Sequence, residues 1–203
     1  MNKKDAILDH ILKEVPFAGW HDGLIRDAVL ALGLEAAYAD LLFPTGTRGV
    51  IEYFFARQNN IMAASFAKID FANMSIRERI FAAVRARIMQ DAIYRPVLKR
   101  TVSYYTMPHR TKAAGSEIWR IADIIWHACG DTSTDYNYYT KRLLLSGVIS
   151  STTLFWLNDC SPEYNDSWVF LQNRIDNVMK IQGIKKTMRD LVSKIPFLRK
   201  LAW

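Results

Sequence analysis

The feature of this chain that most limits its fold is a helical spacing of apolar residues, repeated from one end to the other. Between residues 4 and 15, apolar side chains recur three or four positions apart, as they do on one face of an amphipathic α-helix. Glycine or proline follows several such segments and favours a helix end there. The pattern predicts an all-α protein of about nine to ten helices. The expected helices cover 4–15, 22–32, 34–42, 48–68, 75–95, 96–107, 113–129, 143–157, 161–181 and 184–203.

The size and composition of the chain favour one domain. It has 203 residues, of which 50% are hydrophobic, and this is enough to bury a substantial core. We assign residues 1–183 to a single helical domain and residues 184–203 to a separate amphipathic helix. The longest uncharged run, Leu143–Asn158, is short for a membrane span and contains several hydroxyl residues, so we expect a buried helix.

The net charge of +7 is unevenly distributed. Residues 75–112 hold nine basic and two acidic residues, and residues 180–203 hold seven and one. Such basic patches predict an anionic partner, either a nucleic acid or a membrane with acidic headgroups. For the arginines around the helix expected at 75–95, two interpretations stay open. They form a solvated helix face, or they form a patch for a membrane or an acidic partner.

Three short helices, a glycine turn before the third, and a long fourth helix follow one another at the amino terminus. This is the order of a helix-turn-helix regulator. The residues that carry the likeness are Gly33-Leu34, Tyr38, Phe43-Pro44 and Val50 to Phe55. In these positions the chain resembles the DNA-binding end of the tetracycline-repressor family, whose fold we therefore expect.

The third of these helices lacks the side chains that read DNA. It offers Glu35 and Asp40 and no lysine or arginine, and residues 1–45 hold four basic and seven acidic residues. Recognition helices use basic and amide side chains, and a negative unit repels the phosphate backbone. We interpret residues 1–45 as a vestigial helix-turn-helix part and expect no nucleic-acid partner. A repressor-type transcription regulator with a hydrophobic effector is the alternative function.

Motifs for catalysis or metal binding are weak. Asp123, His127 and Asp131 are spaced as on one helix face, but Gly130 is expected to end the helix before the last of them. No nucleophile elbow or phosphate-binding loop is present. We expect no metal, no cofactor and no catalytic residue. The two cysteines form no metal-type pair, so we expect reduced thiols.

The stretch from Trp126 to Arg142 is expected to join two helices. Gly130 can end the first helix in a left-handed conformation, and Ser133 or Thr134 can cap the second. This leaves a dense group of acidic residues, tyrosines and one arginine unexplained. Because aromatic residues and arginine dominate interface hot spots, the stretch is a candidate docking site for a protein partner.

The chain contains six tryptophans, ten phenylalanines and nine tyrosines. These aromatic residues fill an ordinary core, or some of them line a lipid cavity between helices. Both interpretations stay open on the sequence alone. The residues expected to line such a cavity are Tyr94, Tyr105, Trp119, Trp126, Phe155 and Trp156.

The segment 184–203 combines an apolar helical face with a basic one and ends in tryptophan. These properties are typical of a helix that lies in a membrane interface, although Pro196 predicts a kink. A helix that docks on the body of the protein is the alternative. The residues expected at the membrane are Lys185, Lys186, Arg189, Leu191, Lys194, Ile195, Leu198, Arg199, Lys200 and Trp203.

A longer motif begins at the same helix junction. It comprises Trp126-His127, Gly130-Asp131, Ser133-Thr134-Asp135, Asn137, Tyr139-Thr140 and Arg142, followed by Asp159, Ser161-Pro162, Trp168, Phe170-Leu171 and Asn173-Arg174. Over about residues 117–180 the chain resembles a ubiquinone-biosynthesis accessory family, the ninth of the numbered coenzyme Q proteins. That family is similar in fold to the tetracycline-repressor regulators.

The resemblance implies a lipid-binding protein that does not bind DNA. Its members bind isoprenoid quinone precursors and phospholipid in an apolar cavity, touch an anionic membrane with the last helix, and form homodimers. They present quinone intermediates to the di-iron hydroxylase that acts on demethoxyubiquinone. The partner surface of the family maps to Ile125, Asp135, Tyr138 and Tyr139, with Arg142 close by, and Ile125 and Tyr138 stand where the family has Met and Trp. Because we find no transit peptide, we expect a bacterial protein in the cytoplasm, peripheral on the inner face of the cytoplasmic membrane.

Overall fold

The computed structural model describes residues 2–134 and 136–194, and it describes side chains as far as residue 180. Within this part of the chain every regular element is helical, which confirms the predicted all-α class. Nine α-helices and three short 3-10 turns follow one another in the residues that the structure describes. They are α1 (Lys3–Ala18), α2 (Gly23–Ala31), α3 (Ala37–Leu42), α4 (Thr47–Phe66), α5 (Ile76–Gln90), η1 (Ala92–Tyr94), α6 (Arg95–Tyr105), η2 (Pro108–Arg110), α7 (Thr111–Ala128), α8 (Tyr136–Trp156), η3 (Pro162–Tyr164) and α9 (Asn165–Lys194).

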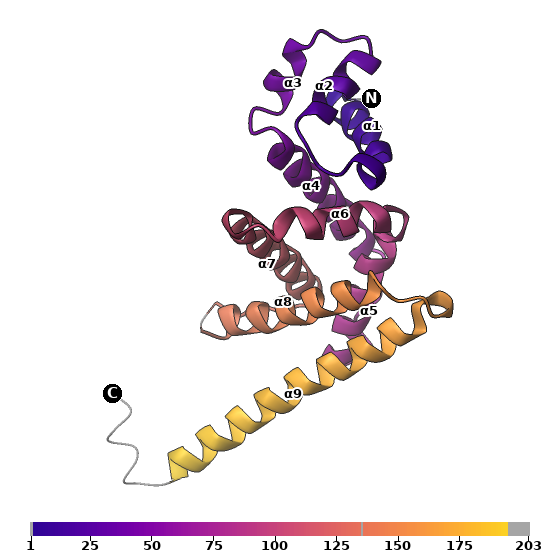
Figure 1. Cartoon of the computed structure of the whole chain (residues 1–203). Coiled ribbons are helices and arrows are strands. Elements are labelled where there is room, and N and C mark those ends of the chain that lie inside the picture. Colours follow the sequence, from indigo (N-terminus) through magenta and orange to yellow (C-terminus); the bar gives the residue numbers. More distant parts are fainter. Residues whose placement is uncertain (1, 135, 195–203) are drawn as a thin grey trace.

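Helices α1 to α3 form a small unit at one end of the molecule, and α4 leads from it into the body (Figure 1). Ile7, Ile11 and Val15 on α1 are fully or almost fully buried, as the apolar spacing predicts. The start of α4 is fixed by Asp22, whose carboxylate accepts hydrogen bonds from the Thr47 hydroxyl at 2.6 Å and the Thr47 backbone N–H at 2.8 Å. These bonds lower the pKa of Asp22.

Two hydrogen bonds tie this amino-terminal unit to α6. The Trp20 indole N–H donates to the Thr101 hydroxyl at 2.9 Å, and Arg100 Nε donates to the carbonyl oxygen of Pro16 at 3.0 Å. Each joins residues more than 80 positions apart in the chain. The unit is therefore attached through α6 as well as through the continuous helix α4.

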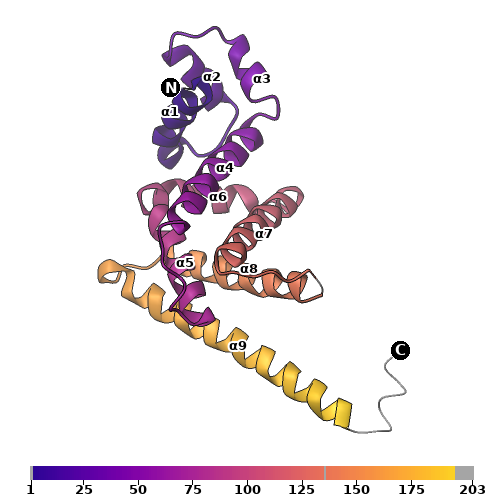
Figure 2. The ribbon, with the colours of Figure 1, turned by 180° about the vertical axis from the view of Figure 1, so that it is seen from behind.

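The body consists of α4 to α8, with α9 lying along α8 and α5 (Figures 1 and 2). Helix α5 begins with the predicted capping box, in which the Ser75 hydroxyl and the Glu78 carboxylate each accept a backbone N–H. Helix α8 is less buried than the sequence analysis predicted. It buries Ile149 and Trp156 but leaves Leu143 66% and Leu154 50% exposed.

The basic patch predicted around α5 is not one continuous surface. Arg79 donates to the carbonyl oxygens of Met74 and Cys129, and Arg95 donates to that of Trp156. Arg87 is only 3% exposed. Several of these arginines therefore bind other groups of the protein. Neither a solvated helix face nor a patch for a membrane or an acidic partner describes the group as a whole.

Helix α9 continues through Gly183, where the sequence pattern predicted a helix end. A single glycine inside a helix costs about 1 kcal/mol, which does not suffice to stop it. The carboxyl-terminal half of α9 extends beyond the other helices in both views (Figures 1 and 2). The division at residue 183 stays a prediction.

The side chains predicted to contact the membrane lie outside those that the structure describes. The side chains of Lys185, Lys186, Arg189, Leu191 and Lys194 lie outside the described ones. The same holds for all of Ile195, Leu198, Arg199, Lys200 and Trp203, and for Pro196 with its expected kink. Among the described helices, none combines the length and the apolar character needed to cross a membrane.

Candidate functional site

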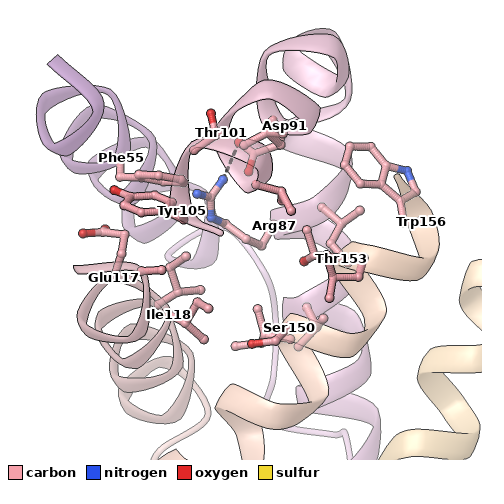
Figure 3. A pocket seen from close by; sticks show the side chains of 18 of the residues that line it. Phe55, Arg87, Asp91, Thr101, Tyr105, Glu117, Ile118, Ser150, Thr153 and Trp156 are labelled. Atoms are coloured by element: carbon pink, nitrogen blue, oxygen red, sulfur yellow. Dashed lines mark ion pairs between the residues drawn. The ribbon is translucent and has the colours of Figure 1, made fainter. Parts of the chain in front are cut away.

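A cavity of about 300 Å³ lies in the body, with walls contributed by α4, α5, α6, α7 and α8 (Figure 3). Most of its wall is aliphatic or aromatic, for example Val84, Ile88, Ile121 and Ile149. Its volume is at the lower end of the range of about 300–1,000 Å³ found for ligand pockets. The geometry supports binding of a mainly apolar molecule.

Of the six residues predicted to line a lipid cavity, Tyr105 and Trp156 line this cavity. Burial raises the pKa of Tyr105 to about 12, so its hydroxyl stays protonated at neutral pH.

The other four predicted lining residues lie elsewhere. The Tyr94 ring packs edge-on against Phe54 at 5.3 Å. Trp126 donates through its indole N–H to the carbonyl oxygen of Lys141 at 3.0 Å. The Phe155 ring stacks on Phe170 at 4.5 Å, and the Trp119 ring lies near Tyr139 at 6.3 Å. These four residues do not line the cavity of about 300 Å³, because residue type alone does not tell which neighbouring helix a side chain meets.

The polar part of the cavity wall is a buried ion pair on α5 and the residue that follows it. Arg87 and Asp91 lie four positions apart and pair with each other, which Figure 3 marks with a dashed line. Burial raises the pKa of Asp91, although the guanidinium opposes this shift. Glu117 also lines the cavity and is occupied, since it accepts hydrogen bonds from Asn59 at 2.7 Å and Arg120 at 3.3 Å.

The junction between α7 and α8 begins as predicted. Gly130 has φ +87°, a conformation in which glycine is favoured. Its N–H donates to the carbonyl oxygen of His127 at 3.0 Å, and the N–H of Asp131 donates to that of Trp126 at 3.0 Å. This pair of bonds is a Schellman motif, which satisfies the last carbonyls of α7. The Ser133 hydroxyl does not cap α8 but donates to the Asp131 carboxylate at 2.8 Å and accepts from Lys141 at 2.7 Å.

Arg142 is the centre of the polar network at this junction. Its side chain is 1% exposed and binds Asp123 at 2.5 Å and Asp131 at 3.1 Å. It also donates to the carbonyl oxygen of Tyr138 at 3.2 Å and lies over the Tyr138 ring. Burial by itself raises the pKa of Asp131, but hydrogen bonds from Lys141, Ser133 and Arg142 outweigh it and bring the pKa to about 2.

The structure divides the predicted partner surface into buried and exposed residues. Ile125 is fully buried and lines the cavity, and Arg142 is buried in the network, so neither is available to a partner in this conformation. Tyr138 is half-buried, with its hydroxyl bonded to Asp123 at 3.1 Å. Tyr139 is 61% exposed. Asp135 lies outside the described residues.

Asp159, in the loop between α8 and α9, was identified only as part of the family motif. Its carboxylate accepts hydrogen bonds from the backbone N–H of Ser161 at 2.7 Å and from both the N–H and the hydroxyl of Ser167. Burial raises its pKa, but these bonds prevail and lower the pKa to about 2. The Ser161 hydroxyl accepts from the N–H of Asp166 at 3.0 Å, as expected for a residue at a helix start.

The two cysteines differ in environment. Cys129, at the end of α7, is 3% exposed, and burial raises the pKa of its thiol to about 11. Cys160 is exposed. They form no disulfide with each other.

Comparison with known proteins shows a family similarity in the part of the chain that forms the junction and part of the cavity wall. The sequence model of the COQ9 family matches residues 111–182, which include α7, α8 and most of the junction network. The chain is 29% identical to the ubiquinone biosynthesis protein COQ9, mitochondrial, of Rattus norvegicus, over 90% of this chain. It is 27% identical to the proteins of that name from Homo sapiens and Schizosaccharomyces pombe, each also over 90% of this chain.

The chain is similar in sequence to the COQ9 proteins. It spans 61% of the length of the rat protein, 59% of the human one and 72% of the fission-yeast one. The expected location in a bacterial cytoplasm, on the inner face of the cytoplasmic membrane, is contradicted by these proteins, which are named as mitochondrial. That expectation was based on the first residues of the chain. Because the chain is shorter than these proteins, its first residues do not indicate where the protein is located.

Solved structures show the fold. A TetR transcriptional regulator from Nitrosomonas europaea superimposes with a TM-score of 0.69 at 18% identity, covering 87% of this chain and 97% of that one. A regulator assigned to the TetR family from Rhodococcus sp. gives a TM-score of 0.56 at 18% identity, covering 87% of this chain and 98% of that one. The predicted tetracycline-repressor-like fold is confirmed, and these structures carry no conclusion about function.

The sequence analysis missed the ion pair in the cavity wall. Arg87 was grouped with the arginines that flank α5, because arginine is mostly exposed in proteins. A local signal was present: Arg87 and Asp91 continue the helical spacing of Ile80, Val84 and Ile88, all of which are buried. A charged pair at positions i and i+4 on an apolar helix face indicates a polar group in a buried wall.

Proposed function

We propose that this chain is a non-catalytic lipid-binding protein of ubiquinone biosynthesis, which holds an isoprenoid quinone precursor and presents it to the di-iron hydroxylase of that pathway. The observation that carries the proposal is the mainly apolar cavity in a chain that is similar in sequence to the COQ9 proteins. A cavity of about 150 Å³ suffices to bind benzene in a protein core, and this one has about 300 Å³. It therefore has room for one ring and a short length of chain.

The exposed rings around the start of α8 are the surface that we assign to the hydroxylase. Tyr136 is 77% and Tyr139 61% exposed, and the Trp119 ring lies beside Tyr139. Aromatic side chains of this kind are enriched among interface hot spots. Contact with an anionic membrane through residues 184–203, and a homodimer, complete the proposal.

Replacing Tyr139 tests the docking surface. We expect Tyr139→Ala to weaken binding of the hydroxylase by about ten-fold or more, since truncation of a hot-spot residue costs about 2 kcal/mol. The matched control is Phe17→Ala on α1, which removes a ring that is 82% exposed at the other end of the molecule. Surface plasmon resonance with the purified hydroxylase measures both. Equal affinities for the two variants would remove Tyr139 from the interface.

Mass spectrometry of the lipid extracted from the purified protein tests the proposed function as a whole. We expect a co-purified isoprenoid or quinone-type lipid at a constant ratio to protein. A protein that carries no lipid and takes none up from quinone-containing vesicles would overturn the proposal.

A transcription regulator with a hydrophobic effector is the other candidate, because it fits the same fold. The exposed acidic residues Glu35 and Asp40, next to and on α3, argue against it. We expect no salt-dependent DNA binding in an electrophoretic mobility assay. Binding that weakens steeply with salt would favour the regulator.

A further inference from the structure

The cavity wall contains a buried arginine whose hydrogen-bonding capacity is only partly used. Arg87 is 3% exposed, and its ion pair with Asp91 engages Nη1. Its Nε and Nη2 atoms are buried and have no hydrogen-bond partner within the described part of the chain. These two nitrogens form one edge of the planar guanidinium, which can hold an oxygen acceptor at two points.

No described side chain forms a hydrogen bond with that edge. Figure 3 shows the guanidinium in the middle of the lining residues, between the rings of Phe55 and Tyr105 on one side and Trp156 on the other. The aliphatic neighbours Val84 and Ile88 have no acceptor atoms. A buried donor without a partner is costly, so the site favours any occupant that brings an oxygen. A water molecule can accept hydrogen bonds from these two nitrogens, and the oxygen of a ligand can displace that water.

The charges of the wall select the kind of oxygen. The positive charge of Arg87 is already balanced by Asp91, and Glu117, which pairs with Arg120 outside the lining, adds a second carboxylate to the cavity wall. An anionic head would therefore enter a wall with more acidic than basic side chains, and repulsion would oppose it. A neutral carbonyl oxygen meets no such repulsion.

We propose that Arg87 determines the specificity of the cavity by donating from Nε and Nη2 to a carbonyl oxygen of a neutral, ring-headed amphiphile. The hydrocarbon part of the ligand then lies against the aliphatic wall. A tail longer than the cavity passes out at the rim, where Thr106 and Leu154 are exposed. This inference rests on the proposed function and deepens it, since it names the atoms that distinguish a quinone from a lipid without a carbonyl oxygen.

Three probes with the same ten-carbon chain test the inference on the full chain by isothermal titration calorimetry. They are a decyl-substituted benzoquinone, decylbenzene, which has no oxygen, and decyl phosphate, which is anionic. We expect the native chain to bind the quinone about ten-fold or more tightly than decylbenzene, as a hydrogen bond from a charged donor predicts. Decyl phosphate is expected to bind more weakly than the quinone.

The matched variants are Arg87→Met with Asp91→Leu, which removes both charges from the wall, and Arg85→Met on the exposed side of the same helix. The double variant is expected to lose the preference for the quinone and to keep its affinity for decylbenzene. Arg85→Met is expected to behave as the native chain. If the double variant does not fold by circular dichroism, Arg87→Lys keeps the charge but lacks the planar edge, and we expect it to bind the quinone about ten-fold more weakly.

The outcomes separate this inference from the proposed function. If the native chain binds neither the quinone nor decylbenzene, the proposed function fails, and the inference fails with it. If it binds both equally, or if the double variant keeps the preference for the quinone, the role of Arg87 is overturned while lipid binding stands. If decyl phosphate binds more tightly than the quinone, the proposed preference for a neutral head group is overturned.

Discussion

Arg142 and Arg87 are both buried beside an aspartate, yet the two sites differ in how fully each guanidinium is used. Arg142 binds two carboxylates and a carbonyl oxygen and lies on an aromatic ring. Arg87 has a single carboxylate and keeps two nitrogens without a hydrogen-bond partner among the described residues. The several hydrogen bonds of Arg142 hold α7 and α8 together. The nitrogens of Arg87 that have no partner lie beside a cavity and can bind a ligand.

Removing Arg142 tests the structural side of this comparison and has the largest expected effect. Arg142→Met leaves Asp123 and Asp131 without their shared cation, and breaking a buried pair in this way costs about 3–5 kcal/mol. Urea unfolding measures the loss. The control is Arg26→Met on an exposed position of α2, for which we expect a change within about 0.5 kcal/mol. Similar values for the two variants would show that the junction network does not stabilise the fold.

Lowering the pH affects the two sites in opposite ways, because the pKa of Asp131 is lowered and that of Asp91 is raised. Because the pKa of Asp131 is lowered to about 2, its contribution to stability is present above the ordinary carboxyl pKa of about 4 and is lost as the pH falls towards 2. The pKa of Asp91 is raised, so falling pH favours its folded, protonated form.

Unfolding free energies measured in urea between pH 7 and pH 2 check this contrast. Asp131→Asn is expected to lose less stability between pH 4 and pH 2 than the native chain loses. Asp91→Asn is expected to lose more, because the opposing contribution is gone. Parallel curves for the two variants would contradict the assignment of opposite shifts.

The smallest effect on stability is expected when the whole cavity pair is replaced. Arg87→Met with Asp91→Leu removes two buried charges and leaves side chains of similar volume, an exchange that is often neutral or stabilising. We expect the free energy of unfolding to stay unchanged or to rise by about 1 kcal/mol. A loss as large as that for Arg142→Met would mean that both ion pairs are structural, and the comparison between them would fail.

Local signals explain what the sequence could predict. Helix positions followed from apolar spacing, which depends on residues three or four apart. The left-handed Gly130 and the capping box of Ser75 and Glu78 followed from the conformational preferences of a few adjacent residues. The order of the first four helices was also correct, because each of the first three is followed within two residues by a glycine or a proline.

The candidate cavity could not be predicted in the same way, because its wall is built by five helices that meet only in the folded chain. Tyr105 and Trp156 were identified as lining residues, but Trp126 and Phe155 were misplaced, since their contacts depend on how α8 packs against its neighbours. Ile125 was assigned to the surface from a family resemblance, yet helix packing buries it. Residue type and spacing give the face of a helix and leave its neighbours undetermined.

Cys129 adds a kinetic property to the α7–α8 junction. Its thiol is buried and has a pKa of about 11, so a thiol reagent reacts with it only when the end of α7 opens. Cys160 is exposed and reacts without any opening. The labelling rate of Cys129 relative to Cys160 therefore measures how often the native junction opens, under conditions in which the rest of the protein stays folded.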